Sequence, residues 1–158
     1  MPKWYISDST ISGKGVFAKK SIRRGEIAFI LKGPIRNFVV TNKKDALAFP
    51  NWIGIAEGQW IDPKKPANYI NHSCEPNLGI RGRVLFVALK DIKKDEELTF
   101  DYSITEEGDW EMECLCGKAR CRSAIGSIHS LPFSIYKKYL PFVPKYFQKV
   151  YTKEGIQK

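Results

Sequence analysis

The 158-residue sequence lacks several features that define common classes of protein. No apolar run reaches the roughly 18 residues that a membrane helix requires, so we expect no membrane partner. Residues 1–8 lack the apolar core of a secretory signal, so we expect an intracellular protein whose cysteines are reduced. Internal repeats and low-complexity tracts are also missing. The length and the 43% hydrophobic content then indicate one globular domain.

Histidine is scarce, since His72 and His129 are the two in the chain. Two histidines leave little material for a His-rich metal site or an Asp-His-nucleophile triad. His72 and Cys74 could form a nucleophilic pair by residue type. They lie two residues apart in a turn rich in Ser, Pro and Asn, however, and no identifiable group would orient the imidazole. A lone histidine in a turn is more often a structural hydrogen-bonding residue.

The net charge of +9 is unevenly distributed. Residues 1–90 carry 15 basic and 6 acidic side chains, whereas residues 91–113 carry 2 basic and 10 acidic ones. Residues 122–158 are again basic, with 7 basic side chains and Glu154 as the one acid. The acidic stretch could attract a basic peptide and the rest an anionic surface. On charge alone, a solvated acidic loop is the simpler interpretation.

Short apolar segments separated by Gly and Pro predict an irregular β domain up to Phe100. The expected strands are 15–18, 26–31, 35–40, 52–56, 59–62, 84–89 and 97–100. Pro66 can begin a single helical turn over 66–71. After Arg122 the pattern becomes helical, with one helix after Pro132 and another short one over 145–151.

Three of the four cysteines form a C-x-C-x4-C run, Cys114, Cys116 and Cys121. Such spacing lets three thiolates face one point, as tetrahedral zinc requires. Cys74 is the remaining cysteine and can be the fourth ligand if the fold brings it near. Four separate buried thiols and adjacent disulfides are the alternatives; the clustering and the reducing compartment disfavour them. Without an open position or a nearby histidine, the ion would be structural.

Several motifs in order carry a resemblance to a known family. They are Gly13-Lys14-Gly15-Val16-Phe17-Ala18, Asn71-His72-Ser73-Cys74-Glu75-Pro76-Asn77, Glu97-Leu98-Thr99-Phe100-Asp101-Tyr102 and the C-x-C-x4-C run. Together the chain resembles a SET-domain protein-lysine methyltransferase, in a minimal form with post-SET zinc cysteines. The resemblance implies an irregular, mainly β fold with a pseudoknot, in which the segment ending at Tyr102 threads under the loop with Asn71 and His72. It divides the chain into a SET domain (1–113), a post-SET zinc segment (114–122) and a basic, mostly helical C-terminal extension (123–158).

The same resemblance implies S-adenosylmethionine as methyl donor and one structural Zn²⁺ held by Cys74, Cys114, Cys116 and Cys121. Tyr102 takes the place of the catalytic tyrosine. The implied cofactor-binding residues are Gly13, Lys14, Gly15, Tyr69, Asn71, His72 and Tyr102. By resemblance, the Asn71 side chain reaches the amino-acid moiety of the cofactor and the His72 backbone reads the adenine.

Phe100, Leu31 and Tyr102 are the residues expected to line the substrate channel. Phe100 falls where the family chooses between Phe and Tyr, and Phe implies di- or trimethylation. Leu31-Lys32-Gly33-Pro34 replaces the family's aromatic-x-Gly-Glu stretch, so Leu31 removes a channel hydroxyl and widens the channel. Asn68 stands where many members have Arg near the cofactor.

The acidic run directly after Tyr102 changes the interpretation of the net charge. At the peptide side of the site it would attract a basic protein such as a histone tail. The basic, aromatic C-terminal extension could make weak nucleic-acid contacts, but packing of its aromatic residues on the domain is the preferred interpretation. We therefore expect a methyltransferase located at chromatin in a eukaryote, or a cytoplasmic protein or secreted effector in a bacterium. A catalytically weak SET module that binds peptide or nucleic acid is the alternative, and a zinc-dependent nucleic-acid module is a third.

Overall fold

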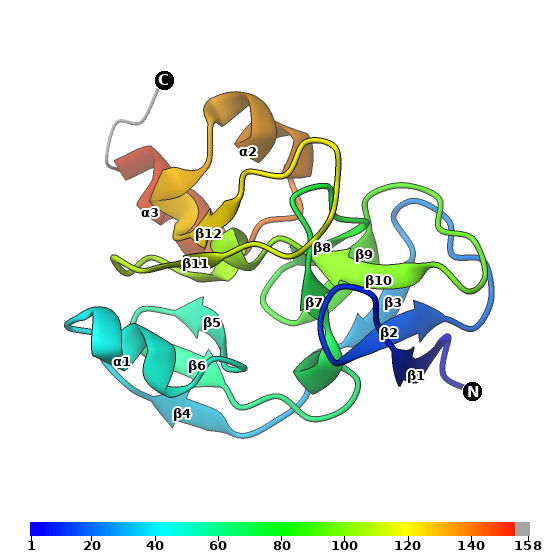
Figure 1. The fold of residues 1–158 in the computed structure, drawn as a ribbon. Coiled ribbons are helices and arrows are strands. Elements are labelled where there is room, and N and C mark those ends of the chain that lie inside the picture. Colours follow the sequence, from blue (N-terminus) through cyan, green and yellow to red (C-terminus); the bar gives the residue numbers. More distant parts are fainter. Residues whose placement is uncertain (154–158) are drawn as a thin grey trace.

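The computed structural model describes residues 1–153, apart from the side chain of Ala46, and shows a mostly β protein with short helices (Figure 1). The strands are β1 (Trp4–Asp8), β2 (Lys14–Ala18), β3 (Ile27–Ile30), β4 (Ile35–Asn37), β5 (Ile53–Ala56), β6 (Gln59–Ile61), β7 (Asn71–His72), β8 (Leu78–Arg81), β9 (Leu85–Ala88), β10 (Glu97–Phe100), β11 (Glu111–Glu113) and β12 (Ala124–Gly126). The helices are α1 (Lys43–Ala48), α2 (Phe133–Tyr139), α3 (Lys145–Lys153) and the 3-10 turns η1 (Ala67–Tyr69), η2 (Tyr102–Thr105) and η3 (Ile128–Ser130). Within residues 1–153, no helix has the length and apolar character needed to cross a membrane. The predicted fold class is confirmed.

Strand β10 is the centre of the main sheet, whose strand order is β1-β2-β10-β8-β9-β3, with β7 also paired to β10. Its first half pairs antiparallel with β2, where Leu98 lies opposite Val16. Its second half pairs in parallel with β7, where Phe100 lies opposite His72. Leu98, Thr99 and Phe100 are all buried, as expected for a strand covered on both faces. The pairing places the strand before Tyr102 directly beside the Asn71–His72 segment, as the resemblance implied.

Two smaller sheets complete the fold. β4, β6 and β5 form one sheet in that order, and α1 lies between β4 and β5 in the chain. The Asn42 side chain caps α1 by accepting a hydrogen bond from the Asp45 amide. β11 and β12 form a separate antiparallel pair, with Met112 opposite Ile125.

The C-terminal helices pack their aromatic side chains into the main core. Tyr136, Tyr139, Phe147 and Tyr151 are at most 5% exposed and belong to the same hydrophobic cluster as the sheet. The Tyr136 and Tyr151 rings stack with centroids 3.8 Å apart. Their burial makes these four rings unable to stack on nucleic-acid bases, so packing is the correct interpretation of the aromatic spacing. The final residues of the 123–158 extension, 154–158, lie outside the described residues.

Each expected strand corresponds to an observed strand that differs by no more than three residues at either end. Strands β1, β7, β8, β11 and β12 and helix α1 were not expected. β8 contains Gly79 and follows Pro76, residues that usually mark turns. β7 has two residues and exists because β10 supplies its partner from 28 residues further on. Long-range pairing of this kind leaves no local sequence signal.

Candidate active site and metal centre

Tyr102 begins η2 directly after β10 and is held at both ends. Its hydroxyl donates to the Ile70 carbonyl oxygen at 2.6 Å, and its backbone N–H donates to His72 Nδ1 at 3.1 Å. Burial raises the pKa of the Tyr102 phenol above its usual range. The side chain is therefore a neutral, fixed hydroxyl rather than a phenolate.

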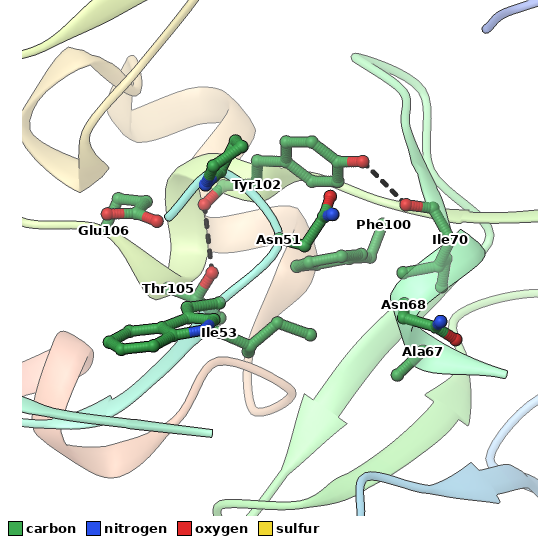
Figure 2. A pocket seen from close by; sticks show the side chains of 11 residues that line it. Asn51, Ile53, Ala67, Asn68, Ile70, Phe100, Tyr102, Thr105 and Glu106 are labelled. Carbon is green, nitrogen blue, oxygen red and sulfur yellow. Dashed lines mark hydrogen bonds between the residues drawn. The ribbon is translucent and has the colours of Figure 1, made fainter. Parts of the chain in front are cut away.

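A narrow pocket opens against the Tyr102 ring (Figure 2). Its apolar lining includes Ile53, Ile70 and Phe100, and the Phe100 and Tyr102 ring centroids are 5.0 Å apart. The other lining residues are Pro50, Asn51, Trp52, Ala67, Asn68, Thr105 and Glu106. Figure 2 shows Glu106 and Thr105 at one end and the hydrogen bond between Tyr102 and Ile70 at the other, with Phe100 between them. Such a pocket suits a long, thin side chain with an apolar stem.

The carboxylate of Glu106 is the one carboxylate that lines this pocket among residues 1–153. Burial, and then the neighbouring Glu107 carboxylate, raise the pKa of Glu106 well above its ordinary value. Glu107 itself is occupied, because it accepts a hydrogen bond from the Tyr146 hydroxyl of α3 at 2.5 Å. The two adjacent acids thus have different surroundings.

His72 is buried, and its ring lies between the Tyr102 backbone and the Cys74 thiol. Burial lowers the pKa of His72 to about 4, so the imidazole is neutral at physiological pH. Its Nδ1 accepts from the Tyr102 amide, and its Nε2 lies 3.4 Å from Cys74 Sγ. Because Nδ1 is an acceptor, the ring proton is on Nε2 and faces the sulfur.

Asn71 is buried and directed at the loop between β1 and β2. Its side-chain Nδ2 donates to the Ser12 and Lys14 carbonyl oxygens, both at 3.1 Å, and to Glu97 Oε1 at 2.8 Å. Gly13 adopts a φ of +48°, a conformation that glycine takes readily. The structure therefore brings Asn71, Gly13 and Gly15 together, as the resemblance implied.

Other residues predicted for the site are more scattered. The Lys14 ammonium points to solvent and pairs with Asp8 at 2.6 Å, so only its backbone carbonyl faces Asn71. Tyr69 is half-buried beneath the Lys65 ammonium, which lies 5.9 Å from the ring centroid. Leu31 is 3% exposed in the core and does not line the pocket against Tyr102. Its assignment to the substrate channel remains a prediction.

The four cysteines converge although Cys74 is 40 residues from the next one. The Sγ atoms of Cys74, Cys114, Cys116 and Cys121 all lie within 4.8 Å of one another, and those of Cys74 and Cys114 are 3.6 Å apart. Four thiolates at about 2.3 Å from one tetrahedral zinc ion would be about 3.8 Å apart. Burial raises the pKa of the Cys74 and Cys114 thiols, so an ion that binds must displace their protons. The cluster fits a tetrahedral metal ion.

Two groups of residues around Tyr102 were not predicted from the sequence. Asn51 and Trp52 reach the pocket from the segment before β5, and no motif marks them. Asp101, next to Tyr102, is 1% exposed and pairs with Arg122 at 2.8 Å. No local pattern marks this pair, because Arg122 lies 21 residues after Asp101 in the chain.

Comparison with known proteins gives the class to which this fold and site belong. The family model described as "SET domain" matches residues 13–103, which include Gly13, the Asn71–His72 segment and Tyr102. The chain belongs to the SET-domain family.

The sequences of its relatives align with the larger part of this chain. A human protein named "Histone-lysine N-methyltransferase 2B" is 32% identical over 130 residues, 72% of this chain and 5% of that protein. A Saccharomyces cerevisiae protein named "Histone-lysine N-methyltransferase, H3 lysine-4 specific" is 33% identical over 132 residues, 72% of this chain and 12% of that protein. The chain thus spans a small fraction of these relatives.

A solved structure described as "crystal structure of KRYPTONITE in complex with mCHH DNA, H3(1-15) peptide and SAH" is similar in fold. It matches with a TM-score of 0.61 and 25% identity over 77% of this chain and 29% of that one. The arrangement of the sheet around β10 is therefore that of a SET domain.

Proposed function

We propose that the chain is an S-adenosylmethionine-dependent protein-lysine N-methyltransferase that acts on a basic, histone-like protein. One observation carries the proposal: the neutral Tyr102 hydroxyl is fixed at the end of a narrow pocket lined by Phe100, next to the Asn71–His72 strand. The relatives' names, together with the H3 peptide and SAH in the complex of the similar structure, support it.

The pocket supports methyl transfer to lysine through the protonation state of the amine. A free lysine has a pKa near 10.4 and must lose its proton before its nitrogen can attack. Ile53, Ile70 and Phe100 form an apolar lining that disfavours the ammonium form. Because the Tyr102 proton is donated to Ile70, the hydroxyl oxygen is left to orient the incoming amine.

Asn71, Gly13 and Gly15 are proposed to hold the amino-acid end of S-adenosylmethionine, which supplies an electrophilic methyl group when bound. Among the described residues, Asn68 Oδ1 is buried without a hydrogen-bond partner. A ligand with ammonium and hydroxyl groups would satisfy such an acceptor. The His72 backbone, the Lys14 carbonyl and Tyr69 are assigned to the same cofactor.

Zinc is the ion we assign to Cys74, Cys114, Cys116 and Cys121. An all-thiolate set without an open position is typical of structural zinc. Backbone amides also point at the sulfurs: Arg122 N lies 3.4 Å from Cys74 Sγ and Ser123 N lies 3.3 Å from Cys121 Sγ. Such donors stabilise negative sulfur around a metal.

A basic substrate is supported by the acidic residues beyond Tyr102. Asp109 and Glu111 line a surface pocket in which Lys43 of α1 is the one basic lining residue among those described, so its lining is acidic overall. A Lys- and Arg-rich peptide complements that charge. Nucleic-acid contact through the extension rests on exposed lysines of α2 and α3, since their aromatic residues are buried. A histone substrate would place the protein at chromatin.

The presence of Phe100 beside Tyr102 supports a di- or trimethylated lysine as the product. A phenylalanine at this position leaves no hydroxyl beside Tyr102 to hold water, so an already methylated nitrogen has more room. Mass spectrometry of the product checks this, because Phe100→Tyr should shift the products toward monomethylation. Only monomethylated product from both proteins would contradict it.

The proposal is tested by incubating the protein with S-adenosylmethionine and core histones and following methylated lysine by mass spectrometry. Tyr102→Phe should lower the rate by about 100-fold or more, because orientation of the reacting groups is lost. Tyr5→Phe is the matched control: Tyr5 loses an exposed hydroxyl bonded to Asp95 at 2.9 Å and should keep the full rate.

Full activity of Tyr102→Phe would contradict the mechanism. Cofactor binding without turnover on any basic protein would favour the alternative of a catalytically weak SET module that binds peptide or nucleic acid. Leu31, in place of a channel aromatic residue, is the feature that favours that alternative.

A further inference from the structure

Asp101, the residue before Tyr102, is a buried carboxylate with an unusually complete set of hydrogen bonds. Its side chain accepts from the Ser103 amide at 3.0 Å and from Arg122 Nη2 at 3.0 and 2.8 Å. It also accepts from the Tyr139 hydroxyl at 2.8 Å. A buried charge is stable only when paired and hydrogen-bonded in this way, so each donor fixes the carboxylate's position.

The donors come from three separate parts of the chain, one of them local to Asp101 and two distant from it. Ser103 belongs to η2 itself, and Arg122 directly follows the metal-ligand candidate Cys121. Tyr139 is the last residue of α2, 38 residues beyond Asp101 and outside the matched SET region of 13–103. The C-terminal extension therefore reaches the residue next to the proposed catalytic tyrosine.

Asp101 is connected to Tyr102 by more than the peptide bond. It is the N-cap of η2, the turn that begins with Tyr102, and its carboxylate holds the Ser103 amide. If the carboxylate rotates, the first turn of η2 loses its cap and Tyr102 changes its orientation toward Ile70 and His72.

The surroundings of Tyr139 keep its hydroxyl protonated, so that the hydroxyl can donate a hydrogen bond. Its ring is 5% exposed, and burial, followed by the Asp101 charge, raises the pKa of its phenol. The hydroxyl therefore keeps its proton and donates it to Asp101 at physiological pH. Simple packing would need the ring of Tyr139 but not its hydroxyl.

We infer that Tyr139 is a positioning residue: through Asp101, which it shares with Arg122, the C-terminal helix α2 fixes the orientation of Tyr102. This inference rests on the proposed function. It gives the extension a role in methyl transfer that its basic, aromatic composition did not indicate.

The test compares Tyr139→Phe with Tyr151→Phe. Tyr151 is the matched control, because its buried hydroxyl, also in the extension, donates to the Leu131 carbonyl oxygen at 2.9 Å and makes no contact with Asp101. Tyr139→Phe should lower kcat about tenfold with KM for the basic substrate unchanged, since small misplacements of reacting groups are costly. Tyr151→Phe should lose similar thermal stability and keep the wild-type kcat.

A second measurement does not depend on turnover. In ¹⁵N-labelled protein, Tyr139→Phe should shift the Tyr102 amide and the His72 Nδ1 resonances, whereas Tyr151→Phe should leave both in place. Equal kcat values for the two variants, or an unmoved Tyr102 amide in Tyr139→Phe, would overturn the inference. If the wild-type protein methylates nothing, the proposed function fails, and the resonances alone decide whether Tyr139 positions Tyr102.

Discussion

The segment from Asp101 to Glu107 lies between two regions that stabilise it by different chemistry. On one side are the exposed strand β11 and the cysteine cluster, whose buried apolar neighbour is Ile125 of β12. On the other side, α2 and α3 insert large aromatic residues into the main core. Tyr102 packs against both clusters.

The difference between these regions concerns what each needs in order to form. Burial of aromatic rings is favourable without any ligand, so the helical side is an integral part of the domain. The four converging thiols have few apolar neighbours and could hold a metal ion, whose binding would stabilise this side. Under the proposed zinc assignment, the proposed catalytic tyrosine is thus supported by one element that needs no ligand and one that a metal ion would stabilise.

Cys74→Ser should have the largest effect of the variants compared, because it removes one of the four thiols on the cysteine side, and that thiol also faces His72. Structural zinc contributes about 10 kcal/mol or more to the folding of small sites, so loss of one thiolate should release the ion. We expect no bound zinc by elemental analysis, faster amide exchange over 111–123 and at least about 100-fold lower methyl transfer. The near-ultraviolet circular dichroism of the aromatic core should persist.

Leu115→Ser is the control for the cysteine variant, because Leu115 lies between two ligand candidates and is 59% exposed. It should retain one zinc per chain. Stoichiometric zinc in Cys74→Ser would show that Cys74 is not a ligand, despite the convergence of the four sulfurs.

Phe147→Ala tests the helical side and should have the next largest effect. Phe147 is 2% exposed in the core, and removing such a ring typically costs about 3–5 kcal/mol. Denaturant unfolding should show this loss while the zinc content of the folded protein is unchanged. Phe133→Ala, at a position 43% exposed on α2, should cost less than about 1 kcal/mol. Equal losses in both variants would mean that the extension is only loosely attached.

The convergence of the four cysteines was easier to predict from the sequence than the residues that line the pocket. Thiol spacing restricts the ligands strongly, and Cys74 was the one cysteine left to complete the set. The fold class followed from ordered motifs around Asn71 and Tyr102, whereas β7 depends on a partner far along the chain and β8 contains Gly79 and follows Pro76, residues that usually mark turns.

The bond between Tyr139 and Asp101 could not be predicted for a related reason. Aromatic spacing in a helix predicts that a face is buried, but it does not identify the buried carboxylate that the face meets. Asn51 and Trp52 reached the pocket in the same way, through the packing of a separate small sheet. Residues that act through tertiary contacts leave no local pattern.

Glu106→Gln should have the smallest effect and tests the junction between the two regions. Burial and Glu107 raise the folded-state pKa of Glu106, so the folded protein retains a proton that the unfolded chain releases near the ordinary carboxyl pKa. The unfolding free energy should therefore fall as the pH rises from the ordinary carboxyl value through the folded pKa, by about 1.4 kcal/mol for each pKa unit of difference. Glu106→Gln should remove this decline in denaturant titrations carried upward from about pH 4.5. The exposed Glu111→Gln should keep it, and an identical pH slope in Glu106→Gln and the wild type would show that the Glu106 carboxylate is well solvated and does not face an apolar pocket.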